Sequence, residues 1–291
     1  MPQSPAFTTL VSTTDLAAHR DDARWVILDC RHDLSDPGAG RQAFISGHVP
    51  RARFAAIDTD LSDKTPALDG QFRGRHPLPQ RAAFIDTLRG WGIDDNTQVV
   101  AYDAHGGMFA ARLWWMLRWV GHPKVAVLDG GLPGWTAGGL PLSTGVDAAK
   151  PARGAIEERP ALVTTVQAPE IAAALGRGEC TVIDARAPDR FRGENETLDP
   201  VGGHIPGAKN RFFKDNLQAD GRFKPPAELR AAFEALIAEP GSTIMQCGSG
   251  VTACHNLLAM EVAGLPGAAL YPGSWSEWCA DQARPVATGA Q

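Results

Sequence analysis

The sequence predicts an α/β fold made of two similar domains, each a parallel sheet flanked by helices. Three observations support this prediction: a length of 291 residues, a repeat that relates the two halves of the chain, and short apolar strands that alternate with helical patterns. A chain of this length is about two domains long. The alternation of strands and helices is typical of a parallel sheet covered by helices.

The repeat is visible in two pairs of motifs. Asp29-Cys30-Arg31 corresponds to Asp184-Ala185-Arg186, and Gly47-His48-Val49-Pro50 corresponds to Gly203-His204-Ile205-Pro206. The two offsets differ by one residue, so the register holds along this stretch. Such a duplication predicts that the halves fold alike. Because the motifs occur in both halves, we expect Arg186, Arg31 and the two histidines to have structural roles.

Apolar segments mark the strands, and a change in composition marks the boundary between the halves. The clearest predicted strands are residues 25–28, 97–101, 124–128 and 243–245. Residues 141–160 are rich in Pro, Gly, Ala and charge, which indicates a linker. We therefore predict a first domain over residues 1–142, a linker over 143–160 and a second domain over 161–291.

The most informative residue is Cys247, which lies between the predicted strand 243–245 and a predicted helix. Gly248 and Gly250 allow the backbone to curl so that its N–H groups point inward, and the helix N-terminus adds partial positive charge. This arrangement favours an anion, which for a cysteine is the reactive thiolate. We predict that Cys247 is a nucleophile. The first half has Asp103 at the corresponding position and lacks this nucleophile.

Phosphate chemistry is the first alternative for such a loop. Cysteine-dependent phosphatases place an arginine six residues after the cysteine, because a dianionic phosphate needs a bidentate cation. Here that position is Ala253. No Gly-Lys-Ser/Thr sequence follows that would form a nucleotide-binding loop. The loop therefore suits a singly charged sulfur species better than a phosphate.

On these residues the chain resembles the rhodanese-like sulfurtransferases. The loop Cys247-Gly248-Ser249-Gly250-Val251-Thr252 is similar to that of the 3-mercaptopyruvate branch, and residues 128–131, 203–208 and 271–278 match further family motifs. The resemblance implies tandem rhodanese-like domains of which only the second is catalytic. It also implies transfer of sulfur from 3-mercaptopyruvate, through a Cys247 persulfide, to a thiol such as reduced thioredoxin or to cyanide. No metal or organic cofactor is implied.

The resemblance further implies a relay of three residues. Ser249, His76 and Asp58 correspond to the group that protonates the departing pyruvate enolate or activates an acceptor thiol, although the match at Asp58 needs a one-residue gap. A hydroxyl moves protons well only when a base and an orienting carboxylate stand behind it.

For the donor, the resemblance implies one arginine and the loop itself. Arg190 corresponds to the arginine that binds the substrate carboxylate, which a guanidinium can grip bidentately. Asp199 stands where mercaptopyruvate enzymes often carry a second arginine, and Arg211 or Lys209 are the candidates to replace it. Pro272 is a second departure, at a position where the family usually has Asp. The loop residues predicted to bind the donor are Gly248, Gly250, Val251 and Thr252.

Composition and charge limit the classes of partner and the location that we expect for this protein. The net charge is −5, which gives no indication of nucleic-acid binding. There is no apolar run long enough to span a membrane and no secretion signal, and five cysteines do not suggest a disulfide framework, so we expect a cytoplasmic protein. Two other functions stay open. One is a thiosulfate sulfurtransferase, favoured if basic residues outside the loop serve a doubly charged donor. The other is a persulfide carrier that loads sulfur without turnover.

Overall fold

The computed structural model describes residues 6–68, 70–146 and 151–290. These residues form two compact units, described separately here. The first comprises the described parts of Met1–Leu61, Pro79–Leu162 and Gln218–Phe223, and the second those of Ser62–Leu78, Val163–Leu217 and Lys224–Gln291. The domain boundaries expected from the sequence stay predictions, and residues 147–150 of the expected linker lie outside the described residues.

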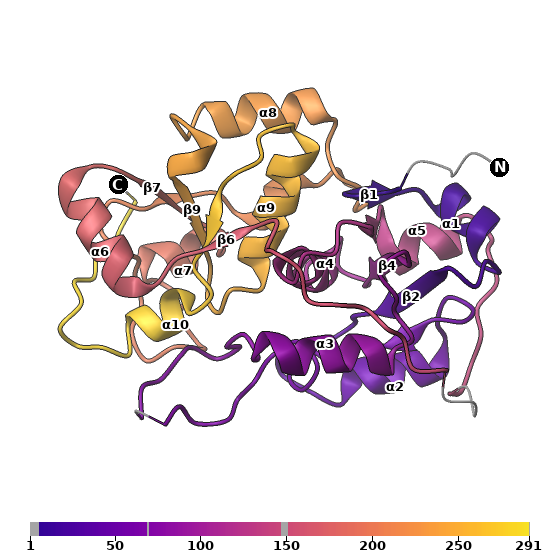
Figure 1. Ribbon diagram of the computed structural model, residues 1–291. Coiled ribbons are helices and arrows are strands. Elements are labelled where there is room, and N and C mark those ends of the chain that lie inside the picture. The colour runs from indigo at the N-terminus through magenta and orange to yellow at the C-terminus, as the bar shows by residue number, and fades with distance from the viewer. Residues whose placement is uncertain (1–5, 69, 147–150, 291) are drawn as a thin grey trace. The chain divides into compact units, whose positions relative to one another are not determined.

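In the described part of the first unit, the sheet has five parallel strands in the order β1-β5-β4-β2-β3. Strands β1, β2 and β4 of this sheet are labelled in Figure 1. The strands are β1 (Leu10–Val11), β2 (Trp25–Asp29), β3 (Arg53–Phe54), β4 (Gln98–Tyr102) and β5 (Val125–Leu128). Every residue of β4 and β5 is buried, as expected for strands covered on both faces.

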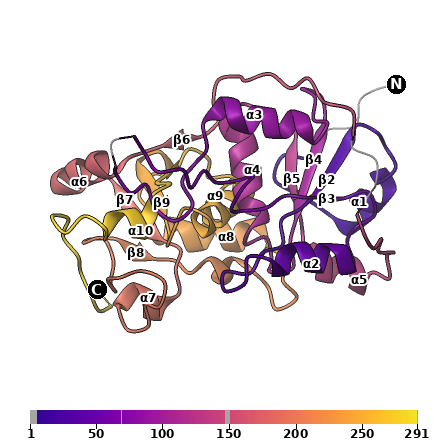
Figure 2. The same ribbon diagram turned by 90° about the horizontal axis from the view of Figure 1, so that it is seen from below.

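Helices cover both faces of this first sheet. They are α1 (Thr13–His19), α2 (Ala39–Ser46), α3 (Arg81–Gly90), α4 (Ala110–Trp119) and α5 (Gly131–Ala137). Leu16 of α1, Phe44 of α2 and Trp135 of α5 share one buried cluster with alternate residues of the strands, so these helices pack on one face. Figure 2 shows α3 on the opposite side of the sheet from α2.

The second unit repeats this topology. In its described residues the parallel sheet has the order β6-β10-β9-β7-β8. The strands are β6 (Thr164–Thr165), β7 (Thr181–Asp184), β8 (Lys209–Asn210), β9 (Thr243–Gln246) and β10 (Ala269–Leu270). The helices are α6 (Ala168–Arg177), α7 (Pro188–Arg192), α8 (Pro226–Glu234), α9 (Thr252–Val262) and α10 (Ser274–Trp278), with 3-10 turns η1 (Phe213–Asn216) and η2 (Pro240–Ser242). Among the described residues, no helix has the length and apolar character needed to cross a bilayer.

The repeated Asp-x-Arg motif forms the same buried ion pair in each unit. Nη2 of Arg186 lies 2.6 Å from Oδ2 of Asp184 and also donates to the carbonyl oxygen of Gly203 at 2.7 Å. Arg31 makes the equivalent pair with Asp29 at 2.6 Å. The structural role expected for Arg186 and Arg31 is thus met. The arginine ties the end of a strand to the loop that leads to the next strand.

The histidines of the repeated Gly-His motifs also have matching environments. Nδ1 of His48 lies 2.8 Å from the carbonyl oxygen of Phe44, and Nδ1 of His204 lies 2.8 Å from that of Phe191. Each imidazole also stacks on the ring of the phenylalanine whose carbonyl oxygen it contacts. Both histidines are buried, so the structural role expected for them is met.

Asp103 stands in the first unit at the position that Cys247 has in the second. It follows β4 as Cys247 follows β9. Its Oδ1 accepts from the backbone N–H groups of His105 and Gly107, at 2.7 and 3.0 Å, and its Oδ2 from those of Phe109 and Ala110, at 2.7 and 3.0 Å. The carboxylate therefore occupies the anion position of its own loop, which leaves no place there for an incoming anion.

Candidate active site

Cys247 directly follows β9, the middle strand of the second sheet, and α9 begins five residues later at Thr252. The cysteine is 2% exposed. Gly250 has a φ of +76°, in the left-handed region, and its Cα lies against the backbone of Pro272, so a side chain would clash there. The loop turns back at Gly250 into the helix. Cys247 thus lies in the loop that leads into the N-terminus of α9.

The turn that opens α10 holds the Cys247 loop in place. The backbone N–H of Cys247 donates to Oγ of Ser274 at 3.1 Å, and the N–H of Trp275 donates to the carbonyl oxygen of Cys247 at 2.9 Å. The N–H of Ser276 donates to the carbonyl oxygen of Gly248 at 3.0 Å. Both backbone polar groups of Cys247 are therefore satisfied by this turn.

Ser274 adopts an unusual backbone conformation in this turn. It is fully buried, and its φ of +53° is in the left-handed region that non-glycine residues rarely adopt. Its Oγ also donates to the carbonyl oxygen of Tyr271 at 2.9 Å. We predict that Ser274→Ala lowers the free energy of unfolding by about 1–3 kcal/mol, because the Cys247 N–H is left buried without an acceptor.

Urea unfolding of Ser274→Ala would check this prediction, with Ser242→Ala as the control, since Ser242 is partly exposed and its hydroxyl donates only to the neighbouring carbonyl of Glu239. Ser274→Gly loses the same hydroxyl but relieves the backbone strain, so its stability is expected to fall between Ser274→Ala and the wild type. A Ser274→Ala protein as stable as Ser242→Ala would contradict the role given to the hydroxyl.

Ser249 and His76 form the pair that the sequence predicts. Oγ of Ser249 lies 2.7 Å from Nδ1 of His76, and both side chains are buried, at 6% and 5% exposure. The hydroxyl donates to Nδ1 when that nitrogen carries no proton. His76 belongs to the segment Ser62–Leu78, which groups with the second unit. Asp58 belongs to the first unit, so its place in the relay stays a prediction.

The same α10 turn positions the segment that carries His76. The backbone N–H of Arg75 donates to Oγ of Ser276 at 3.1 Å. Gly74, with a φ of +91°, lies so close to Gly273 that a Cβ would be 2.6 Å from its carbonyl oxygen. One short turn therefore holds both the nucleophile loop and the histidine. The sequence motif 271–278 pointed to this turn but gave no indication of its contacts.

Two arginines cover the loop beside the nucleophile. A Cβ at Gly248 would lie 2.8 Å from Nη2 of Arg75 and 3.7 Å from Nη1 of Arg190. Arg190 is the arginine predicted from the sequence, and its side chain is 20% exposed. Arg75 was missed, although it stands next to His76 in the chain. Glycine at position 248 leaves room for the close approach of Arg75, whereas Arg190 lies at an ordinary van der Waals distance.

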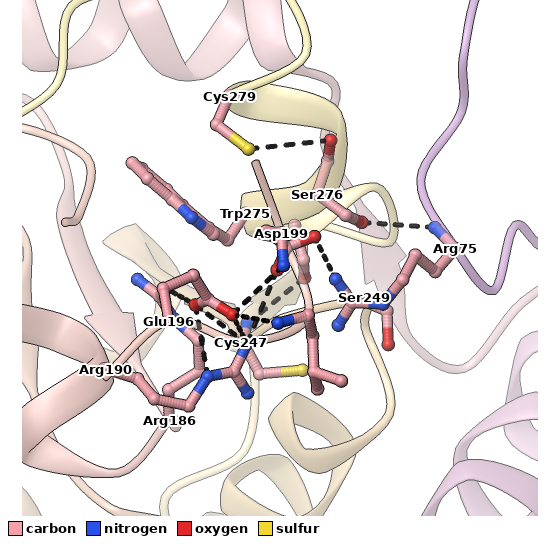
Figure 3. A network of polar contacts seen from close by, with 12 residues as sticks. Arg75, Arg186, Arg190, Glu196, Asp199, Cys247, Ser249, Trp275, Ser276 and Cys279 are labelled. Carbon is pink, nitrogen blue, oxygen red and sulfur yellow. Dashed lines mark hydrogen bonds and ion pairs between the residues drawn. The ribbon is translucent and has the colours of Figure 1, made fainter. Parts of the chain in front are cut away.

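Two buried carboxylates hold these arginines (Figure 3). Glu196 accepts from Nη2 of Arg190 at 2.7 Å and from Nη1 of Arg186 at 3.3 Å. Asp199 accepts from Nη1 of Arg75 and, at 3.4 Å, from Nη2 of Arg190. Their side chains are only 4% and 2% exposed. The cation site is thus a network of ion pairs.

Glu196 is ionised at neutral pH. Burial alone would raise its pKa, but the hydrogen bonds from Arg190 and from the backbone outweigh burial and lower the pKa below its usual range. Its stabilising contribution is therefore present above the unfolded-state pKa of a glutamate and is lost as the pH falls through the lowered folded-state pKa. The ion pair with Arg190 persists throughout the neutral range.

A family model described as a rhodanese-like domain matches residues 12–138 and 167–281. The chain belongs to the rhodanese-like sulfurtransferases. It is 46% identical to a probable 3-mercaptopyruvate sulfurtransferase of Pseudomonas aeruginosa, over 96% of this chain and 98% of that protein. It is 40% identical to a putative thiosulfate sulfurtransferase of Mycobacterium tuberculosis, over 90% of each. The structure of 3-mercaptopyruvate sulfurtransferase from Leishmania major matches with a TM-score of 0.85 and 31% identity, over 98% of this chain and 78% of that one. The predicted fold class is confirmed.

In this rhodanese-like sulfurtransferase, Asp199 departs from the mercaptopyruvate pattern, in which a second arginine is common. Lys209 and Arg211 are the residues expected to replace that arginine, but the structure points to a different one. Nζ of Lys209 donates to the carbonyl oxygen of Leu236 at 2.6 Å, and Nη2 of Arg211 donates to Oδ1 of Asn216 at 3.0 Å. Within the described part of the chain, neither cation bonds to the Cys247 loop. Arg75 is the second cation that lies beside this loop.

Proposed function

We propose that this chain is a 3-mercaptopyruvate sulfurtransferase in which Cys247 carries the transferred sulfur as a persulfide. The observation that supports this most directly is the 2.7 Å contact between Ser249 and His76, two residues from the buried nucleophile. Mercaptopyruvate leaves as an enolate that needs a proton, and a hydroxyl backed by an imidazole can deliver one. Thiosulfate leaves as sulfite, which needs no such proton.

In the first half-reaction the Cys247 thiolate attacks the sulfur of the donor. The carbon–sulfur bond breaks, and its electron pair passes to the three-carbon fragment, which departs as pyruvate enolate. The enolate takes a proton through Ser249 and His76. Arg190 and Arg75 bind the donor carboxylate through the guanidinium nitrogens that face Gly248.

In the second half-reaction an acceptor thiolate attacks the outer sulfur of the persulfide. The sulfur–sulfur bond breaks, its electron pair returns to Cys247, and the acceptor leaves as a persulfide. Reduced thioredoxin is the proposed type of protein acceptor, and cyanide would leave as thiocyanate. The backbone of the loop from Gly248 to Thr252 would hold the persulfide between the two steps. We place this reaction in the cytoplasm.

Thiosulfate is the second candidate donor, and one observation favours it. Arg75 and Arg190 lie outside the loop sequence yet beside Gly248, where they offer positive charge to a doubly charged donor. The Mycobacterium tuberculosis relative carries a thiosulfate name. Asp199 and Glu196 oppose this reading, because they already neutralise the same arginines.

Steady-state kinetics test the proposal. We expect kcat/KM for mercaptopyruvate, with a thiol acceptor, to exceed that for thiosulfate by at least about tenfold. Varying both substrates should give parallel double-reciprocal lines, since the covalent intermediate separates the half-reactions. A preference for thiosulfate would establish the second candidate instead. Stoichiometric loading of Cys247 without turnover on either donor would identify a carrier protein.

A further inference from the structure

We infer that Asp199 sets the donor preference of this site, by aligning Arg75 and Arg190 beside the Cys247 loop and by neutralising part of their charge. This inference rests on the proposed sulfurtransferase function. Asp199 is buried, at 2% side-chain exposure, and joins two segments that are distant in the sequence. It stands where related enzymes often have a cation, so it reverses a charge near the donor.

The ion pairs decide which guanidinium nitrogens remain for the donor. Arg75 uses Nη1 for Asp199 and turns Nη2 toward Gly248. Arg190 uses Nε and Nη2 for Glu196 and Nη2 again for Asp199, and its Nη1 lies beside Gly248 at almost the same distance as Nη2. Among the described residues, neither Nη2 of Arg75 nor Nη1 of Arg190 has a hydrogen-bond partner. One nitrogen of each arginine is thus presented at the loop.

The charges in the described part of this network balance. The guanidinium groups of Arg75, Arg186 and Arg190 face the carboxylates of Asp184, Glu196 and Asp199. A donor with one carboxylate can bind the two presented nitrogens with a single buried charge. A dianion brings a second negative charge for which the network holds no uncompensated cation, and burying an uncompensated charge is costly.

Asp199 therefore favours mercaptopyruvate over thiosulfate in two ways. Alignment of the two arginines favours a planar carboxylate, which matches a pair of nitrogens at fixed positions. The negative charge disfavours a dianionic donor such as thiosulfate. A merely structural ion pair would instead affect both donors equally when it is removed.

The test is Asp199→Asn, with Asp189→Asn as the matched control. Asp189 lies in α7 beside Arg190, is partly exposed, and accepts from Asn195 and from the backbone N–H of Arg190. We expect Asp199→Asn to raise the thiosulfate-to-mercaptopyruvate ratio of kcat/KM by about tenfold. The change should come mainly from a higher KM for mercaptopyruvate and a lower KM for thiosulfate, with kcat little altered. The control should leave the ratio unchanged, and Asp199→Glu, which keeps the charge, should restore most of the preference.

An equal fall for both donors in Asp199→Asn would overturn the inference while leaving the proposed function intact. A wild type that prefers thiosulfate would refute the proposed donor, yet the ratio should still rise in Asp199→Asn if the inference holds. If Asp199→Asn fails to fold, inhibition of the wild type alone still tests the inference. Propionate, a monoanion, should inhibit more strongly than malonate, a dianion with the same number of carbon atoms, and the reverse order would contradict the inference.

Discussion

Cys247→Ser is expected to lower turnover of either donor by at least about 10⁴-fold. A serine hydroxyl ionises far less readily than a thiol, and its oxygen cannot carry a persulfide. The fold should be intact, because the bonds that hold residue 247 use its backbone N–H and carbonyl oxygen and not its sulfur. Initial rates with mercaptopyruvate and a thiol, and with thiosulfate and cyanide, would measure the loss.

Cys180→Ser is the control for this variant. Cys180 also lies in the second unit, is partly exposed, and directly precedes β7. Burial raises the pKa of the Cys180 thiol, so at neutral pH it is a poor nucleophile. Cys180→Ser should keep wild-type rates. Substantial turnover in Cys247→Ser, at an unchanged thermal midpoint, would refute the assignment of the nucleophile.

Ser249→Ala is expected to lower kcat with mercaptopyruvate by about 10²–10³-fold, the usual contribution of positioned proton transfer. Its effect on thiosulfate turnover should be much smaller, because sulfite departs without a proton. The variant should also flatten the pH dependence of kcat, since His76 acts through the hydroxyl at 2.7 Å. Rates with both donors across neutral pH provide the measurement.

A double-mutant cycle with His76→Ala separates a relay from two independent effects. If Ser249 and His76 act as one unit, the double variant should lose about as much activity as either single variant. Ser242→Ala, at a partly exposed serine of the same unit, should leave the activity unchanged. Additive losses, or equal losses for the two donors, would contradict the relay.

The fold and the nucleophile were predictable because both depend on local patterns. The strand, the Gly-x-Gly turn and the helix around Cys247 follow one another in the chain, and the repetition of Arg186 as Arg31 indicated a structural role for both. Asp103 was correctly placed opposite Cys247. Its backbone hydrogen bonds, however, could not be foreseen, because they depend on the exact path of the loop.

The cation site was not predictable in the same way, because it depends on contacts between distant segments. Arg75 lies in an irregular stretch with no periodicity, and only the packing of Gly74 on Gly273 brings it to the loop. In the sequence, Asp199 was recognised only as the residue that stands in place of an expected second arginine. In the structure it is a partner of two arginines, a relation that no local spacing encodes.

Intact-protein and peptide mass spectrometry after one exposure to mercaptopyruvate, without an acceptor, tests the central claim most directly. We predict a mass gain of one sulfur atom on the peptide that contains Cys247, release of one equivalent of pyruvate, and return to the original mass when a thiol is added. An added sulfur on another cysteine, or pyruvate release without any adduct on Cys247, would contradict the persulfide mechanism.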